Sequence, residues 1–224
     1  ISAAQIEGGW NEGGKSPVLV DYCTAGSTKE RRQIWYLDKN GQRVHRNWEA
    51  VDELEEGCKF AFFDDLHYTN HVASDFYHHY KEDIALMKEL GMKIYRFSLS
   101  WARIIPDGDG KVNQAGIDFY HNVIDCLLEN GIQPFVTLYH FDLPYALVEK
   151  YNGWENRECV NAFERYAKVC FKEYGDKVKY WQVINEQNLM IRVDERMNIN
   201  EPDPWKADKI RAQMDYHMFL AHAL

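Results

Sequence analysis

From residue 75 onward the chain alternates between two hydrophobic periods, and this alternation constrains its fold more than any other feature. Apolar side chains recur at helical spacing over residues 75–90, 114–130 and 157–174, and a glycine follows each of these stretches closely. Strand-like segments occupy residues 93–99, 134–139 and 178–184, and another helix begins near Trp205. Because strands and helices alternate at a spacing of about 40 to 45 residues, the pattern predicts parallel α/β units.

Two parallel α/β folds compete for this pattern, an open doubly wound sheet and a closed (β/α)8 TIM barrel. The chain has no G-x-G-x-x-G or Walker-type loop, so the usual support for a nucleotide-binding open sheet is missing. Polar residues gather instead where the strands end, namely Arg96 and Ser98, His140 and Asp142, and Asn185 and Glu186. Functional side chains at successive strand ends are typical of a barrel's catalytic face, and we therefore predict the barrel.

The number of strands predicts only part of such a barrel. A complete one needs eight units and typically about 250 residues, whereas three strands are clear here, with a fourth if residues 1–6 are the tail of the first. We expect residues 1–224 to form a single domain that supplies roughly the first four βα units, the C-terminal half being absent. Residues 8–74 are predicted as a long irregular rim loop after strand 1. A half-barrel exposes sheet edges, so we expect the isolated half to associate or aggregate. Whether the intact protein forms a homo-oligomer is left open by the sequence.

Composition and charge exclude several classes of function. The net charge of −9 argues against nucleic acid as a partner, and any phosphate on a substrate must be held by a few local cations. No apolar run approaches the roughly 20 residues that a membrane span needs, and no signal segment opens the chain. Five cysteines, odd in number and without a C-x-x-C pair, predict reduced thiols and a cytoplasmic location. The aromatic content of 14% weakly favours a carbohydrate ligand.

Glu186 is the first candidate catalytic residue. If strand alternation continues to it, Glu186 lies on the same face as Gln182 and Ile184. Burial at the mouth of a barrel would raise the pKa of its carboxyl, which suits a general acid; the alternative is an exposed loop glutamate. Arg96 also points inward by alternation, and a buried guanidinium needs a carboxylate partner. That partner is either structural or a catalytic carboxylate that Arg96 orients.

His140 and Gln5 are the candidate binding residues. His140 continues the inward row of the second clear strand, where it serves either as a structural residue or as a contact for sugar hydroxyls. The amide of Gln5 offers both a donor and an acceptor to neighbouring hydroxyls. We predict no metal site, because no H-E-x-x-H motif is present and the histidine pairs lack a third ligand.

Taken together and in order, five segments resemble the motifs of the family 1 glycoside hydrolases, which are retaining β-glycosidases on an eightfold α/β barrel. The resemblance spans nearly the whole chain. The segments are Gln5-Ile6-Glu7-Gly8, Tyr80-Lys81-Glu82-Asp83-Ile84, Tyr95-Arg96-Phe97-Ser98-Leu99-Ser100-Trp101, Tyr139-His140-Phe141-Asp142-Leu143-Pro144 and Asn185-Glu186.

The resemblance implies a role for each candidate residue. Glu186 would be the general acid/base, Asn185 would hold the sugar 2-hydroxyl, and Arg96 would orient the nucleophile. Gln5 and His140 would bind glycone hydroxyls in the first subsite. The family's nucleophile is a second glutamate in a Thr/Ser-Glu-Asn-Gly motif, which does not occur here; this agrees with an absent C-terminal half. Retention needs two carboxylates about 5 to 5.5 Å apart and implies no metal or organic cofactor.

Several residues and segments of the sequence are similar to those of one subgroup of the family, the bacterial 6-phospho-β-glucosidases. They include Phe141, where ordinary β-glucosidases usually carry Trp, and Gln187, where those enzymes commonly carry Pro. Two further similar segments are Trp10-Asn11-Glu12-Gly13-Gly14-Lys15 and His71-Val72-Ala73-Ser74-Asp75-Phe76-Tyr77. The resemblance implies hydrolysis of 6-phospho-β-D-glucosides, a small-molecule partner, inside the cell. The alternatives are a β-glucosidase or β-galactosidase acting on unphosphorylated sugars, and a non-catalytic sugar-binding or structural half-barrel.

Overall fold

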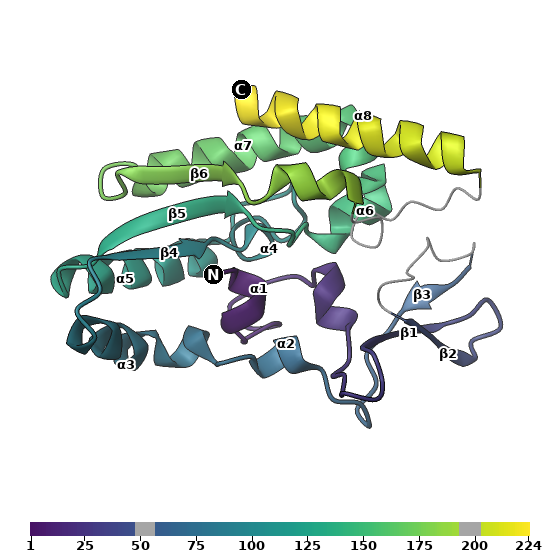
Figure 1. Cartoon of the computed structure of the whole chain (residues 1–224), viewed down its shortest axis with the longest axis horizontal. Helices are drawn as coiled ribbons and strands as arrows, with labels where there is room; N and C mark the ends of the chain where they lie inside the picture. Colours follow the sequence, from purple (N-terminus) through teal and green to yellow (C-terminus); the bar gives the residue numbers. More distant parts are fainter. Residues whose placement is uncertain (48–56, 193–202) are drawn as a thin grey trace.

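Three parallel strands form the central sheet of the molecule in the order β4-β5-β6. The computed structural model describes residues 1–47, 57–192 and 203–224. The strands are β4 (Ile94–Ser98), β5 (Gln133–Tyr139) and β6 (Tyr180–Ile184), which confirms the three predicted strands to within two residues. Neighbours in the sheet are also consecutive in sequence and all run in one direction (Figure 1). A barrel adds its strands in this way, whereas a doubly wound sheet reverses the strand order.

The long helices alternate with these strands, as the sequence predicts. They are α3 (Phe76–Glu89), α5 (Gln114–Glu129), α7 (Arg157–Tyr174) and α8 (Pro204–Ala223). The side chain of Asn156 caps α7 by accepting the backbone N–H of Glu158, and Asp203 caps α8 in the same way. Shorter helical segments that the sequence analysis did not predict are α2 (Thr69–Val72), α4 (Trp101–Ile104), α6 (Tyr145–Tyr151), η1 (Leu19–Tyr22), η3 (Gly153–Glu155) and η4 (Gln187–Arg192). Within the described ranges, none of the helices is long and apolar enough to cross a bilayer.

The first residues form a helix, so the prediction that residues 1–6 are the tail of a strand was wrong. Helix α1 (Ala3–Ile6) closes with a hydrogen bond from the Glu7 N–H to the Ala3 carbonyl. The Ala3 N–H donates to Ser98 Oγ over 2.8 Å at the end of β4. Because this contact ties α1 to the carboxyl end of the sheet, Gln5 lies near the strand ends, on a helix.

Residues 8–74 are less irregular than predicted. They contain an antiparallel sheet in the order β2-β1-β3, made of β1 (Gln33–Leu37), β2 (Arg43–Asn47) and β3 (Lys59–Phe60). In the turn between β1 and β2, Asp38 Oδ1 accepts the N–H groups of Asn40 and Gln42, and Gly41 has a φ of 75°. The Asn40-Gly41 pair is a hairpin signal that the sequence analysis did not use. Residues 48–56 of the predicted loop lie outside the described residues.

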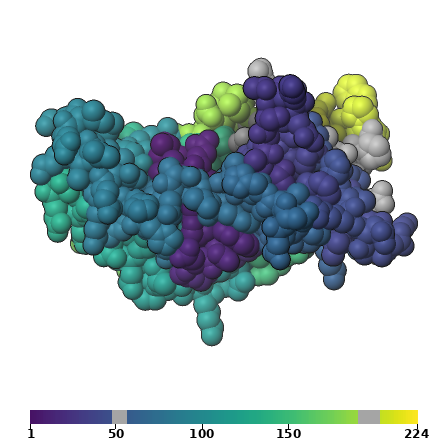
Figure 2. Space-filling view, turned by 90° about the horizontal axis from the view of Figure 1, so that it is seen from below, coloured from purple at the N-terminus to yellow at the C-terminus, as the bar shows by residue number. Residues whose placement is uncertain are grey.

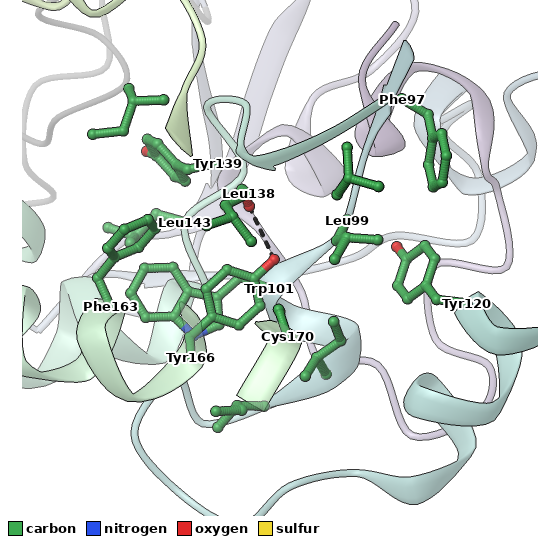
Figure 3. Close-up of a cluster of buried hydrophobic side chains, with 14 of the residues drawn as sticks. Phe97, Leu99, Trp101, Tyr120, Leu138, Tyr139, Leu143, Phe163, Tyr166 and Cys170 are labelled. Carbon is green, nitrogen blue, oxygen red and sulfur yellow. Dashed lines mark hydrogen bonds between the residues drawn. The ribbon is translucent and has the colours of Figure 1, made fainter. Parts of the chain in front are cut away.

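The main hydrophobic core lies between the central sheet and the helices (Figure 3). Trp101 and Tyr166 are both fully buried, and their rings stack with centroids 5.0 Å apart. The Tyr166 hydroxyl donates to the Leu138 carbonyl over 2.9 Å, as the dashed line in Figure 3 marks. This packing holds the carboxyl end of β5 in place, directly before His140. All five cysteines are free thiols.

Candidate active site

A chain of hydrogen bonds from Arg96 crosses the carboxyl end of the central sheet. From β4, Arg96 Nε donates to Thr137 Oγ1 on β5 over 3.0 Å, and Arg96 Nη2 donates to Asn185 Oδ1 over 2.5 Å. The Asn185 N–H donates to the Tyr139 carbonyl over 2.9 Å, which fixes the residue after β6 against β5. Asn185 is only 3% exposed. Arg96, Thr137 and Asn185, which we call the strand-end network, therefore hold three strand ends in one geometry.

The sequence analysis expected a carboxylate beside Arg96, and the structure places an amide there. The partners of the Arg96 side chain among the described residues are a hydroxyl and an amide oxygen. Both acceptors are neutral groups, so neither of them balances the positive charge of the guanidinium. An anionic group entering the site would be attracted to it.

Glu186 joins the strand-end network through its neighbour. The Asn185 Nδ2 donates to Glu186 Oε2 over 3.3 Å. The strand ends at Ile184 and Glu186 has a φ of 45°, so strand alternation does not reach it. The Glu186 side chain is exposed, and the expected burial of this carboxyl was wrong for the described chain. A left-handed non-glycine residue costs about 1–3 kcal/mol, and such residues cluster at functional sites.

Gln5 and His140 meet at a second position along the same edge of the sheet. Gln5 on α1 is exposed, and His140, the residue after β5, is half-buried. In the view of Figure 2, the purple N-terminal residues around α1 lie beside the blue segment that contains α2 and α3. Gln5 and His140 line one hollow of about 80 Å³, together with Ser2, Ala4, Val20, Arg32, Asn70 and Phe141. A hollow of about 500 Å³ that shares Gln5, Arg32 and Asn70 extends along α2.

Asp142 supports His140 and received no role in the sequence analysis. Asp142 is 1% exposed, and its Oδ1 accepts the His140 N–H over 3.3 Å. The residue between them, Phe141, has a φ of 65°. Burial raises the pKa of the Asp142 carboxyl to about 7. A carboxylate placed between two apolar residues directly after a strand is the sequence signal that could have indicated this role.

Glu7 and Arg103 form a buried ion pair behind Gln5, and sequence reasoning missed this pair. Arg103 Nε donates to Glu7 Oε2 over 3.1 Å, and Arg103 Nη2 also donates to the carbonyls of Gly8 and Gly9. Tyr120 donates its hydroxyl to Glu7 Oε1 over 2.6 Å. Gly8 has a φ of 66°, and a Cβ there would lie 2.2 Å from the Val72 carbonyl oxygen, so the position requires glycine.

Three stacked aromatic rings lie beside residues that line the larger hollow. The His71 ring lies between Trp10, at 4.0 Å, and Tyr68, at 4.7 Å, and is nearly parallel to both. Its Nε2 contacts the Asp21 carbonyl at 2.9 Å. Burial lowers the pKa of His71. Across the described residues, no group of three His, Cys, Asp or Glu side chains is placed to hold a metal ion.

The sequence matches known proteins along most of its length. The sequence profile described as glycosyl hydrolase family 1 matches residues 58–224. A coniferin β-glucosidase from Pinus contorta is 55% identical over 69% of this chain and 29% of its own length. An aryl-phospho-β-D-glucosidase from Bacillus subtilis is 43% identical over 90% of this chain and 36% of its own length.

Solved structures agree with these matches. A β-glucosidase from rice superimposes on the whole chain with a TM-score of 0.73 and 34% identity, and a family 1 β-glucosidase from Thermotoga maritima does so with 0.73 and 32%. In both comparisons the chain covers 42% of the solved structure. The fold is therefore that of part of a TIM barrel, and the chain spans less than half the length of these relatives.

Proposed function

The chain belongs to glycosyl hydrolase family 1, and from this premise we propose that it carries the acid/base part of a retaining β-glucosidase site. The proposed substrates of the complete protein are 6-phospho-β-D-glucosides. The observation that carries the proposal is the strand-end network, which joins Arg96 through Asn185 to Glu186. It places a basic, an amide and an acidic group at the carboxyl ends of parallel strands, where barrel enzymes bind substrate.

In the proposed reaction, Glu186 protonates the leaving oxygen while a second carboxylate attacks the anomeric carbon and the glycosidic bond breaks. Glu186 then accepts a proton from water, whose oxygen displaces the enzyme carboxylate and releases the sugar with retained configuration. The second carboxylate belongs to the part of the family's barrel that this chain does not span. Arg96 would orient it, because the guanidinium meets neutral acceptors within the chain.

The other candidate residues bind the sugar in this proposal. The Asn185 amide, already held by Arg96, contacts the 2-hydroxyl, and Gln5 and His140 contact the remaining glycone hydroxyls from the hollow that they share. Glu186 is exposed in the chain itself. We expect bound substrate and the remaining barrel to exclude water from it, as proton transfer to the leaving oxygen requires.

Two observations favour a phosphorylated substrate. The aryl-phospho-β-D-glucosidase from Bacillus subtilis aligns with 90% of the chain. Phe141, one of the residues by which the sequence resembles the 6-phospho-β-glucosidases, lines the hollow. A cytoplasmic location would follow, since such substrates are phosphorylated during uptake. The second candidate is an unphosphorylated β-glucoside, which the 55% identity to the pine coniferin β-glucosidase favours.

A paired assay separates the two candidates. We expect the complete protein to turn over p-nitrophenyl β-glucoside 6-phosphate with a higher kcat/KM than the unphosphorylated glucoside. Equal or better turnover of the unphosphorylated sugar would contradict the phospho-specificity and support the second candidate. Sugar binding in calorimetry without any turnover would support a binding role.

A variant series tests Glu186 itself. Glu186→Gln should lower kcat by at least about a hundredfold for alkyl glucosides, whose poor leaving groups need a proton, and much less for p-nitrophenyl substrates. Glu129→Gln, an exposed substitution on α5, is the matched control and should leave both rates unchanged. Unchanged alkyl glucoside hydrolysis by Glu186→Gln would show that the acid lies elsewhere.

A further inference from the structure

A buried carboxyl group accepts a hydrogen bond from within the turn after β5. Asp142 Oδ1 accepts the backbone N–H of His140 across Phe141, whose φ of 65° is unfavourable for an aromatic residue. This bond shapes the turn that places both His140 and Phe141 at the hollow shared with Gln5. Asp142 itself does not line that hollow. Its effect on a bound ligand is therefore exerted through the two residues before it.

The surroundings of Asp142 favour an uncharged carboxyl. The side chain is 1% exposed, and its Oδ2 has no hydrogen-bond partner among the described residues. The charge of Glu7, directly after α1, disfavours ionisation of Asp142. The charge of Lys15 favours it, but Lys15 is paired with Asp21 at 2.7 Å. Tyr166 on α7 stays uncharged, because burial raises the pKa of its hydroxyl far above the usual value.

An ionised Asp142 would be poorly stabilised in this turn. A buried carboxylate normally needs several donors, and here the backbone N–H groups of His140, at 3.3 Å, and of Asp142 itself lower the pKa by less than burial raises it. Loss of the proton therefore favours a rearranged turn in which water reaches Oδ2. Because the turn carries His140, such a rearrangement changes the surface that the hollow presents to a ligand.

We propose that Asp142 is a positioning residue which, as a neutral acid, holds the turn of His140 and Phe141 in the conformation that binds the sugar. Deprotonation of Asp142 releases this turn and weakens sugar binding. The inference rests on the proposed function, in which His140 contacts the glycone. The proposal adds a pH dependence of sugar affinity, which is separate from the proton transfer that Glu186 performs in the reaction.

The test measures sugar affinity against pH in the complete protein carrying Glu186→Gln, which lacks the acid that hydrolysis of an alkyl glucoside needs. The probe is methyl β-glucoside 6-phosphate, whose poor leaving group prevents rapid hydrolysis and whose own titration is common to all variants and cancels in their ratio. If only the neutral form binds, a group with a pKa of about 7 weakens the affinity about tenfold at pH 8 relative to pH 6. Asp142→Asn keeps an acceptor for the His140 N–H and does not ionise. The ratio of its affinity to that of the parent protein should therefore rise about tenfold from pH 6 to pH 8.

Three further measurements make the outcome decisive. Asp142→Ala removes the acceptor and should bind weakly at both pH values. Asp118→Asn, an exposed change on α5, should follow the parent protein. Without any sugar, the melting temperature of Asp142→Asn relative to the parent protein should rise from about pH 4 to about pH 7 and then level off. In this range the unfolded aspartate has lost its proton while the folded one, whose pKa is about 7, still holds it.

An affinity ratio between Asp142→Asn and the parent protein that does not change with pH overturns the inference. Full sugar affinity in Asp142→Ala also overturns it. Identical pH dependence of melting overturns it even without a sugar measurement. Failure of the parent protein to bind sugar at pH 6 contradicts the proposed function instead. In that event the melting comparison alone decides whether Asp142 holds the turn as a neutral acid.

Discussion

Arg103 and Glu7 form an ion pair that is almost completely removed from water, with Nε and Oε2 3.1 Å apart and side-chain exposures of 0% and 5%. The pair joins helix α4, which follows β4, to the segment directly after α1. Since α1 carries Gln5, this contact and the Ala3–Ser98 hydrogen bond together set the position of a candidate binding residue relative to the sheet.

Replacing Arg103 should destabilise the fold strongly. Arg103→Met preserves much of the packing volume but leaves Glu7 buried without its counter-charge, which costs about 3–5 kcal/mol. Urea unfolding would measure the loss. Lys168→Ala, which breaks an exposed pair with Glu164 on α7, is the control and should change stability by about 0.5 kcal/mol or less. Comparable effects of the two substitutions would contradict the importance of the buried pair.

Removing the hydroxyl of Tyr120 should also weaken the same network. Tyr120→Phe removes the donor to Glu7 and the acceptor for the Ser100 N–H, both over 2.6 Å. Leaving these buried groups unsatisfied should cost about 1–3 kcal/mol. The control is Tyr151→Phe. The Tyr151 hydroxyl donates to Asp109 near the surface, and its removal should cost clearly less stability. A double-mutant cycle with Arg103→Met should be non-additive, and strict additivity would show that the two partners of Glu7 act independently.

Arg96→Lys should impair activity more than stability. A lysine keeps the charge but not the fork that spans Thr137 and Asn185, so the amide loses its fixed orientation. We expect kcat/KM of the complete protein to fall by at least about tenfold. Thr137→Val removes only one branch of the strand-end network and should have a smaller effect. A larger loss in the Thr137 variant would shift the positioning role from Arg96 to β5.

The rim around His71 should loosen in acid. Burial holds the pKa of His71 below its usual value of 6.5, so the unfolded segment binds a proton more readily than the folded one. The contribution of His71 to stability is therefore complete above 6.5 and is lost as the pH falls toward the lower folded pKa. Hydrogen exchange of residues 10–24 and 68–73, corrected for intrinsic rates, should show weaker protection at pH 5 than at pH 7.5.

Two variants check this assignment. His71→Phe keeps a ring between Trp10 and Tyr68 but does not titrate, so the difference between the two pH values should vanish. His79→Gln, an exposed substitution on α3, should retain it. An unchanged acid effect in the His71→Phe variant would place the titrating group elsewhere.

The central strands and long helices were predictable because their signals are local. Apolar periodicity and the following glycines located β4, β5 and β6 and the helices between them. The antiparallel sheet around β1 was missed although Asn40-Gly41 marks its turn. The strand predicted at residues 1–6 was wrong, since a segment of this length has no periodicity that separates a strand from the turn of helix observed in α1.

Three results came from the amino-acid sequence alone: the order of the central strands and long helices, the family resemblance, and the choice of candidate residues, which are Gln5, Arg96, His140, Asn185 and Glu186. The roles of these residues stay predictions. Only the tertiary structure revealed that Arg96 meets an amide, that Glu186 is exposed in a left-handed conformation, and that Glu7 and Asp142 are buried. The physical reason is that burial, hydrogen-bond partners and pKa shifts depend on residues distant in sequence, such as Glu7 and Arg103, whose encounter is decided by chain packing.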